Sequence, residues 1–239
     1  MERASVSGAE PCGCRSQRRA EHLEDRAQIP PLYRHASFEN FNVRASDNPI
    51  AHRQLSNVYI AVNNFAREFP NESRPGLLLI GEPGTGKTHL AVAALRKIAE
   101  KGFDCLFCDY QNLFDRIRAG FDPASNSADR MAYQNALEAD VLLLDDLGAQ
   151  RTIEWVQDTI TSIITYRCNN KKPLIATTNL PDPDADGRMM EKDDFGKLRA
   201  RRTLAEQIGE RARSRLYEMC TVVTVRVTED YRVRKAKKF

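Results

Sequence analysis

Two kinds of hydrophobic pattern alternate along this chain. Short apolar runs are bounded by polar or turn-forming residues, whereas the longer segments between them carry apolar residues at helical spacing. Continuous apolar strands between helices are typical of a parallel sheet that is covered on both faces. The pattern therefore predicts an α/β fold, a doubly wound parallel sheet with helices on both faces. Strands are expected at 77–80, near 103–108, and at 141–144, 174–177 and 221–227.

Helices are expected between these strands. Apolar residues from Ile50 to Phe65 recur at helical spacing, and Pro70 ends that segment. Near the C-terminus, one helix would carry an apolar stripe made of Leu204, Ile208, Ala212 and Leu216. The expected helices cover 49–69, about 89–100, 110–119, about 128–138, 152–167 and about 204–216.

The domain boundaries follow from local composition. Residues 1–28 are predicted to be a flexible segment, 29–48 a linker, and 49–239 one folded domain. The segment 181–203 carries six acids and six bases and is expected to be an inserted mobile loop, with DNA or partner contact as the less favoured alternative. The tail 231–239 is basic, and we favour a solvated charge run over phosphate contact. Its bases are Arg232, Arg234, Lys235, Lys237 and Lys238.

Composition narrows the class of protein. A chain of 239 residues with 41% hydrophobic and 29% charged residues can bury a full α/β core. No apolar run approaches the roughly 18 residues that a membrane span needs, and the polar N-terminus lacks a signal-peptide core. We therefore expect a cytoplasmic protein with no membrane partner. Because the net charge is only +3, any nucleic-acid contact must come from local patches.

The six cysteines do not form a disulfide pattern. Cys105 and Cys108 lie in a predicted strand and are expected in the core. Cys12 and Cys14 lie in a polar, basic segment and could supply half of a zinc site. His22 is the one further ligand nearby, and no fourth follows, so we do not expect zinc.

The most specific chemical signal lies between the strand 77–80 and the helix after it. It matches the phosphate-binding pattern G-x-x-x-x-G-K-[ST]. The glycines let backbone N–H groups close around a polyphosphate, and Lys87 places a charge on the β- and γ-phosphates. Thr88 offers a hydroxyl to Mg²⁺ at the N-terminus of a helix. The expected nucleotide-binding residues are Gly81, Glu82, Pro83, Gly84, Thr85, Gly86, Lys87, Thr88 and His89.

Polar residues follow two further predicted strands. Asp145 and Asp146 follow the strand 141–144 and would emerge at the ligand-binding edge of the sheet. Asp145 is expected to hold Mg²⁺ through water, and Asp146 to polarise the water that attacks the γ-phosphate. Asn179 follows the strand 174–177, where a neutral amide can orient that water. A turn-forming asparagine is the alternative.

Arg211 and Arg215 lie four residues apart along the margin of the predicted C-terminal helix. Arginines at the edge of a packed helix can reach the γ-phosphate of a neighbouring subunit. Surface ion pairs are an equally weighted alternative at this stage.

These segments together carry a family resemblance. The ordered set GEPGTGKTHLAVAAL, VLLLDDLGAQ, ITYRCNNKKPLIATTNLP, GERARSRL and EDYR resembles the DnaC/IstB-type ATPases of the AAA+ class. The resemblance covers about 29–232 and implies a P-loop NTPase fold and hydrolysis of ATP with Mg²⁺. It implies that Asn179 is the polar sensor, Arg215 an arginine finger that acts in trans, and Arg211 an auxiliary candidate. It also places the segment of Phe38 and Phe41 near the adenine.

The upstream segment IPPLYRHASFENF resembles the linker of bacterial and phage helicase loaders. This implies binding of a hexameric replicative helicase and its placement on single-stranded DNA, with ATP controlling assembly and release. A finger acting in trans requires head-to-tail self-association in the presence of ATP. The candidate contacts for single-stranded DNA are Tyr110, Phe114, Arg116 and Arg118, with core packing of Phe114 as the alternative.

The sequence departs from the family pattern in two places. Only about 28 residues precede the linker, where loaders carry a helicase-binding module, and about a dozen follow the last predicted strand. The helical lid of many AAA+ proteins is therefore expected to be absent.

Three alternatives remain open. A transposition helper ATPase, which binds duplex DNA and a transposase, shares every nucleotide motif, although the linker favours the loader. A small-molecule kinase would need an acceptor site and a lid, and neither is predicted. A slow ATP-binding switch would differ from the ATPase only in rate.

Overall fold

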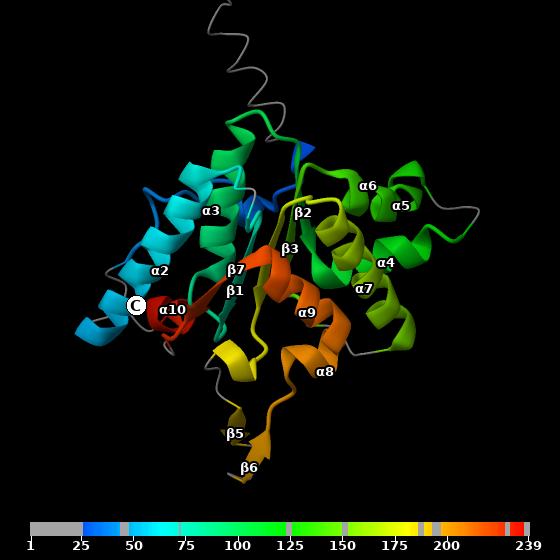
Figure 1. Cartoon of the computed structure of the whole chain (residues 1–239). Coiled ribbons are helices and arrows are strands. Elements are labelled where there is room, and N and C mark those ends of the chain that lie inside the picture. The colour runs from blue at the N-terminus through cyan, green and yellow to red at the C-terminus, as the bar shows by residue number, and fades with distance from the viewer. Residues whose placement is uncertain are drawn as a thin grey trace, which may run out of the picture.

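A five-stranded parallel sheet forms the centre of the protein (Figure 1). Its strand order is β2-β3-β4-β1-β7, so β4 lies between β3 and β1. The computed structural model describes residues 26–43, 48–71, 73–122, 126–149, 153–185, 189–192, 197–227 and 230–236. The strands are β1 (Gly76–Gly81), β2 (Cys105–Asp109), β3 (Val141–Asp145), β4 (Leu174–Thr178) and β7 (Cys220–Val225).

Helices cover both faces of this sheet. They are α2 (Pro49–Glu68), α3 (Lys87–Ala99), α4 (Tyr110–Ala119), α5 (Ser127–Arg130), α6 (Ala132–Glu138), α7 (Glu154–Asn169), α8 (Leu204–Ile208) and α9 (Glu210–Met219). Successive residues of a strand face opposite sides, so Leu77 and Leu79 pack in one core and Leu78 and Ile80 in the other. α2 and α3 cover the first face, whereas α4, α6, α7, α8 and α9 cover the second (Figure 1). The predicted doubly wound fold is confirmed.

All five strands of the sheet lie within two residues of their predicted positions. The single helix expected at 204–216 was wrong, because the chain forms α8 and α9 with a break between them. Gly209 has φ 89 and ψ 147, a conformation outside the helical region. Thr203 and Glu206 form a capping box that begins α8. All four residues of the expected apolar stripe are nevertheless buried.

The segment 181–203 is not an irregular loop in its described part. It contains the 3-10 helix η2 (Pro183–Ala185) and the antiparallel strands β5 (Met190–Lys192) and β6 (Leu198–Ala200), which lie below the sheet in Figure 1. The amide of Leu204 donates to the Pro181 carbonyl at 3.0 Å, so the two ends of the segment meet. Asp182 is fully buried and accepts two hydrogen bonds of 2.6 Å from Arg213 of α9. This ion pair fixes the start of the segment to α9.

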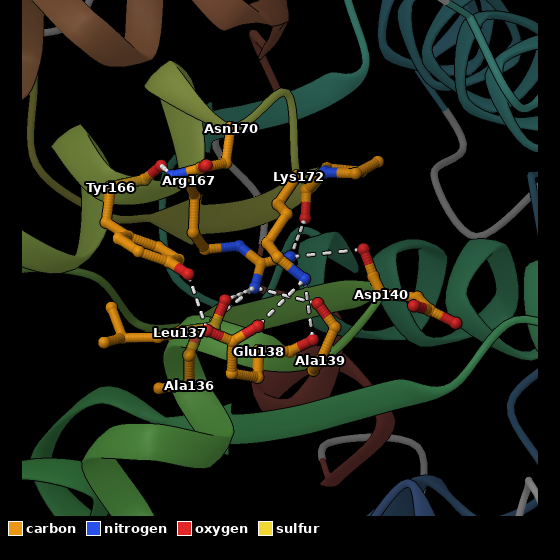
Figure 2. A network of polar contacts seen from close by, with 10 residues as sticks. Ala136, Leu137, Glu138, Ala139, Asp140, Tyr166, Arg167, Asn170 and Lys172 are labelled. Atoms are coloured by element: carbon orange, nitrogen blue, oxygen red, sulfur yellow. Dashed lines mark hydrogen bonds and ion pairs between the residues drawn. The ribbon is translucent and has the colours of Figure 1, made fainter.

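Arg167 of α7 joins the end of α6 to the starts of β3 and β4 (Figure 2). Its guanidinium is fully buried and donates only to backbone carbonyls, three of which lie at the C-terminal end of α6. Burial lowers the pKa of Arg167 to about 10, while the nearby Asp140 carboxylate opposes that shift. The accepting carbonyls belong to Ala136, Leu137, Ala139, Asp140 and Pro173.

Two further sequence predictions concern the cysteines. Cys105 and Cys108 are buried, as predicted, and burial raises the pKa of each thiol to about 12. Cys12, Cys14 and His22 lie outside the described residues.

Across the part of the chain that the structure describes, no helix combines the length and apolar character needed to cross a bilayer. The described linker contains η1 (Pro31–Tyr33), and α10 (Tyr231–Ala236) is the helix described after β7.

Candidate nucleotide-binding site

A pocket of about 480 Å³ opens at the carboxyl edge of the sheet. β1, β3 and β4 end there, which brings the residues that follow them together, as ligand sites of open α/β sheets require. Gly81 ends β1, Glu82 and Pro83 follow it, and none of the three is among the described residues that line the pocket. The lining residues that the sequence predicted are Gly84, Thr85, Gly86, Lys87, Thr88, His89, Asp145, Asp146 and Asn179.

The loop before α3 has the backbone conformation of a phosphate cradle. Gly84 has φ 71 and Gly86 has φ 90, in the left-handed region that side chains disfavour. A Cβ atom at Gly86 would also lie 2.7 Å from the ring of Phe41. Thr85 Oγ1 donates to the Glu82 carbonyl at 2.8 Å and closes the loop. The first N–H groups of α3 therefore remain directed at the pocket, where an anion can accept from them.

Lys87 enters the pocket from the first turn of α3. Its side chain is only 5% exposed, and its ammonium donates to the Glu82 carbonyl at 2.8 Å and to Asn179 Oδ1 at 2.6 Å. Burial lowers its pKa to about 8, although the carboxylates of Asp146, Asp145 and Glu82 oppose that shift. Both acceptors are uncharged oxygens, so phosphate oxygens are better partners for this ammonium.

Thr88 and Asp145 lie side by side in the pocket, where the sequence predicts a site for Mg²⁺. Thr88 Oγ1 donates to Asp145 Oδ1 at 2.9 Å, and the Thr177 hydroxyl donates to the same oxygen at 2.6 Å. Burial raises the pKa of Asp145, while these two hydrogen bonds favour its charged form. A hydroxyl and a carboxylate side by side suit Mg²⁺, which keeps waters and phosphate oxygens as its other ligands. No cluster of three metal-ligating side chains occurs within the described ranges.

Asn179 connects Lys87 to Asp146. Its amide nitrogen donates to Asp146 Oδ1 at 2.6 Å, while its oxygen accepts from Lys87. Asp146 has φ 56, and its own amide donates to Thr177 Oγ1 at 3.0 Å. The structure therefore brings together the three polar groups that the sequence placed on different strands.

The linker forms the opposite wall of the pocket. Leu32, Tyr33 and Phe41 line it, whereas Phe38 lies behind them in edge contact with Tyr59. The side chain of His89 supports this wall, because its Nε2 lies 2.9 Å from the Ser37 carbonyl and its ring lies 5.3 Å from that of Phe41. An aromatic and apolar wall beside the phosphate loop suits a nucleobase.

Sequence reasoning missed two sets of basic residues at this site. We expected the C-terminal bases to be solvated apart from the domain, but Arg232 and Arg234 of α10 line the pocket. The Tyr231 amide donates to the Gly84 carbonyl at 3.1 Å, which holds α10 against the loop. Arg201, which follows β6, reaches Glu82 and Asn179 from outside the pocket. Their only sequence signal was their charge.

Arg211 and Arg215 lie elsewhere in the same chain. Neither is among the described residues that line the pocket. Arg215 pairs with Glu218 of its own helix at 2.6 Å on the surface, and Arg211 is exposed. One chain alone therefore does not place either arginine at its own phosphate loop.

The fold and the site together define a class of protein. The phosphate loop follows β1, the acidic pair follows β3, and the asparagine follows β4, which lies between those two strands. This arrangement is that of a P-loop ATPase of the AAA+ class. The family described as IstB-like ATP binding protein matches residues 9–238. The chain belongs to this family.

Individual relatives are also similar to this chain. A crystal structure of the DnaC helicase loader is 30% identical, with a TM-score of 0.62 over 82% of this chain and 99% of that one. The replicative helicase loader DnaC of Buchnera aphidicola subsp. Baizongia pistaciae is 27% identical over 67% of this chain and 62% of its own length. The DnaC of Escherichia coli strain K12 is 24% identical over 65% of this chain and 60% of its own. The chain thus spans about three fifths of these curated relatives.

Proposed function

We propose that this protein is a Mg²⁺-dependent ATPase that loads a replicative helicase onto single-stranded DNA. The observation that carries the ATPase part is the link from Lys87 through Asn179 to Asp146. It connects the group that binds the phosphates to the carboxylate that activates water. The loading part is supported by relatives that are named replicative helicase loaders.

The chain's own residues account for the steps of hydrolysis. Lys87 exchanges its two neutral acceptors for oxygens of the β- and γ-phosphates, which frees Asn179 to face the γ-phosphate. Asp146 accepts a proton from the attacking water, and Asn179 orients that water. Thr88 and Asp145 would hold Mg²⁺, which would supply positive charge beside the phosphate oxygens.

We assign the finger role to Arg215 of a neighbouring subunit, with Arg211 as an auxiliary. Its half-exposed position on α9 suits this role, because an ion pair with Glu218 at the surface is readily exchanged for a phosphate. Subunits that share sites in this way associate head to tail when ATP is bound.

Of the four residues predicted to contact single-stranded DNA, we keep only Arg118 in the proposal. Tyr110 and Phe114 are buried, and Arg116 bonds to Asp129 at 3.3 Å, so these three are committed to the fold. Arg118 is exposed, and its guanidinium lies 5.5 Å from the centre of the Trp155 ring. Phe121 is 72% exposed and lies 6.5 Å from the same ring. We call Arg118, Phe121 and Trp155 the Trp155 patch, and it combines a cation with aromatic faces for stacking.

ATP hydrolysis by the purified protein tests this function. We expect single-stranded DNA and the host's replicative helicase to stimulate turnover, and the helicase to co-elute with the protein in ATP. Stimulation by duplex DNA alone, without a helicase complex, would overturn the loader assignment. It would favour a transposition helper, which the IstB-like family membership supports.

The patch is tested separately by Phe121→Ala. Loss of one stacked base costs about 1–3 kcal/mol, so we expect affinity for single-stranded DNA to fall by about tenfold. Ile60→Ala is the control, because Ile60 is also a large exposed apolar residue, on α2. Equal affinities for the two variants would remove the patch from the proposal.

A further inference from the structure

Two cations hold the same pair of residues at the edge of the pocket. Lys87 donates to the Glu82 carbonyl and to the side chain of Asn179 from inside the pocket. Arg201 donates to the Glu82 carboxylate at 2.6 Å and to the Asn179 carbonyl at 2.9 Å from outside it. Lys87, Glu82, Arg201 and Asn179 therefore form a closed ring of hydrogen bonds across the ends of β1 and β4.

Arg201 is partly buried and its backbone is held in place, and both features strengthen these contacts. Its side chain is 16% exposed and that of Glu82 is 27% exposed, so water screens this ion pair less than a surface pair. Its backbone is also fixed, because its amide donates to the Met189 carbonyl at 2.9 Å beside the hairpin of β5 and β6. Arg201 thus bridges the inserted segment and the phosphate loop.

Nucleotide binding affects the two cations differently. A triphosphate draws Lys87 away from Glu82 and Asn179, which removes the inner half of the ring. The outer half stays in place, because no phosphate competes for the Glu82 carboxylate or the Asn179 carbonyl. Asn179 then depends on Arg201 for its position at the moment when its amide must face the γ-phosphate.

We propose that Arg201 is a positioning residue that holds Asn179 for recognition of the γ-phosphate and so links the inserted hairpin to nucleotide discrimination. The proposal rests on the ATP site described above. It does not require the phosphate loop itself to depend on Arg201. That loop is held by other hydrogen bonds, from Thr85 to Glu82 and from Tyr231 to Gly84.

Arg201→Ala tests this role, with Arg202→Ala as the matched control. Arg202 is the next residue, is exposed, and has the same charge. Equilibrium binding of ATP and of ADP, each with Mg²⁺, is measured for both variants, together with the turnover of ATP. Because ADP lacks the γ-phosphate, we expect Arg201→Ala to weaken ATP binding about fivefold and ADP binding less than about twofold. Turnover should fall by about tenfold or more, since an unpositioned group loses its catalytic effect.

Two further variants sharpen the result. Arg201→Lys keeps the charge but offers one donor nitrogen where arginine offers two, so it should recover part of the preference for ATP. Glu82→Ala combined with Arg201→Ala should be no worse than Arg201→Ala alone, because the Glu82 carboxylate acts through Arg201.

The outcomes separate this proposal from the ATPase assignment. If the wild-type protein binds ATP without turnover, the ATPase assignment fails, whereas the ratio of ATP to ADP affinity still tests Arg201. An unchanged ratio in Arg201→Ala overturns the proposal. So does an equal loss of ATP and ADP affinity, which would mean that Arg201 only maintains the loop.

Discussion

Lys87 carries its charge in surroundings that disfavour it. The side chain is buried, and its two hydrogen-bond acceptors are neutral oxygens of Glu82 and Asn179. Burial lowers its pKa to about 8, so the ammonium predominates at neutral pH and titrates only slightly above it. The charge that the phosphates require is therefore sensitive to small changes in pH.

ATP affinity should fall as the pH rises through this pKa. Below pH about 8 Lys87 is protonated and attracts the phosphates, whereas above it the neutral amine must first take up a proton. The apparent Kd for ATP should rise by up to about tenfold for each pH unit above the pKa. Calorimetric titration across this range measures the effect. Lys87→Arg, which stays protonated, should give a flat profile, and a flat wild-type profile would contradict the prediction.

Some residues of the site could be predicted from sequence and others could not. Asp145, Asp146 and Asn179 follow apolar runs, and a parallel sheet brings the carboxyl ends of such strands to one edge. Arg201 reaches Glu82 across 119 positions of sequence. It does so from an inserted hairpin, whose location depends on contacts such as Asp182 with Arg213 rather than on any periodicity.

At the scale of elements, α6, β3 and β4 are joined by one guanidinium. Arg167 donates hydrogen bonds to five carbonyls at buried or partly buried positions, without an acidic side chain among its hydrogen-bond acceptors. Removing this guanidinium leaves several of these carbonyls without a donor in the interior. A buried acceptor without a donor lowers the free energy of unfolding more than the loss of an exposed hydrogen bond does.

Arg167→Met should therefore lower the free energy of unfolding by about 3 kcal/mol or more, as measured by urea denaturation. Lys172→Met is the control, because Lys172 bonds the nearby Glu138 carbonyl at a partly exposed position. Its cost should stay below about 1 kcal/mol. A loss of similar size in the two variants would show that the buried carbonyls find other partners.

The elements themselves were largely predictable, because buried strands and helices have strong periodic signals. The break between α8 and α9 was not. The apolar positions from Leu204 to Leu216 fit one helix, and the backbone of Gly209 alone interrupts it. A glycine within a helical pattern is compatible with both outcomes, so tertiary packing decides between them.

At the scale of the whole molecule, one chain carries the residues proposed for the pocket and for the finger at separate places. Lys87 and Asp146 line the pocket, whereas Arg215 lies on α9 and is not among the described lining residues. A resemblance to known ATPases implied this separation, and no pattern within the chain encodes which surfaces of two subunits meet.

Mixing two inactive variants tests the shared site. Arg215→Ala retains a complete pocket, and Asp146→Asn retains a complete finger, so each alone should lose most turnover. In assemblies mixed at equal amounts, the intact pocket of Arg215→Ala meets the intact finger of Asp146→Asn at about a quarter of interfaces. Activity should therefore return to roughly a quarter of the wild-type value. Mixtures that stay as inactive as the separate variants would place the finger in its own chain's site.

The Trp155 patch has a consequence for measurement. Trp155 is the single tryptophan of the chain, and it packs against Phe114 with ring centroids 5.7 Å apart. The tryptophan emission of the unmodified protein therefore comes from one known place. A nucleobase stacked on that indole would quench the emission, so a DNA titration can be followed optically without a dye, a tag or an engineered reporter.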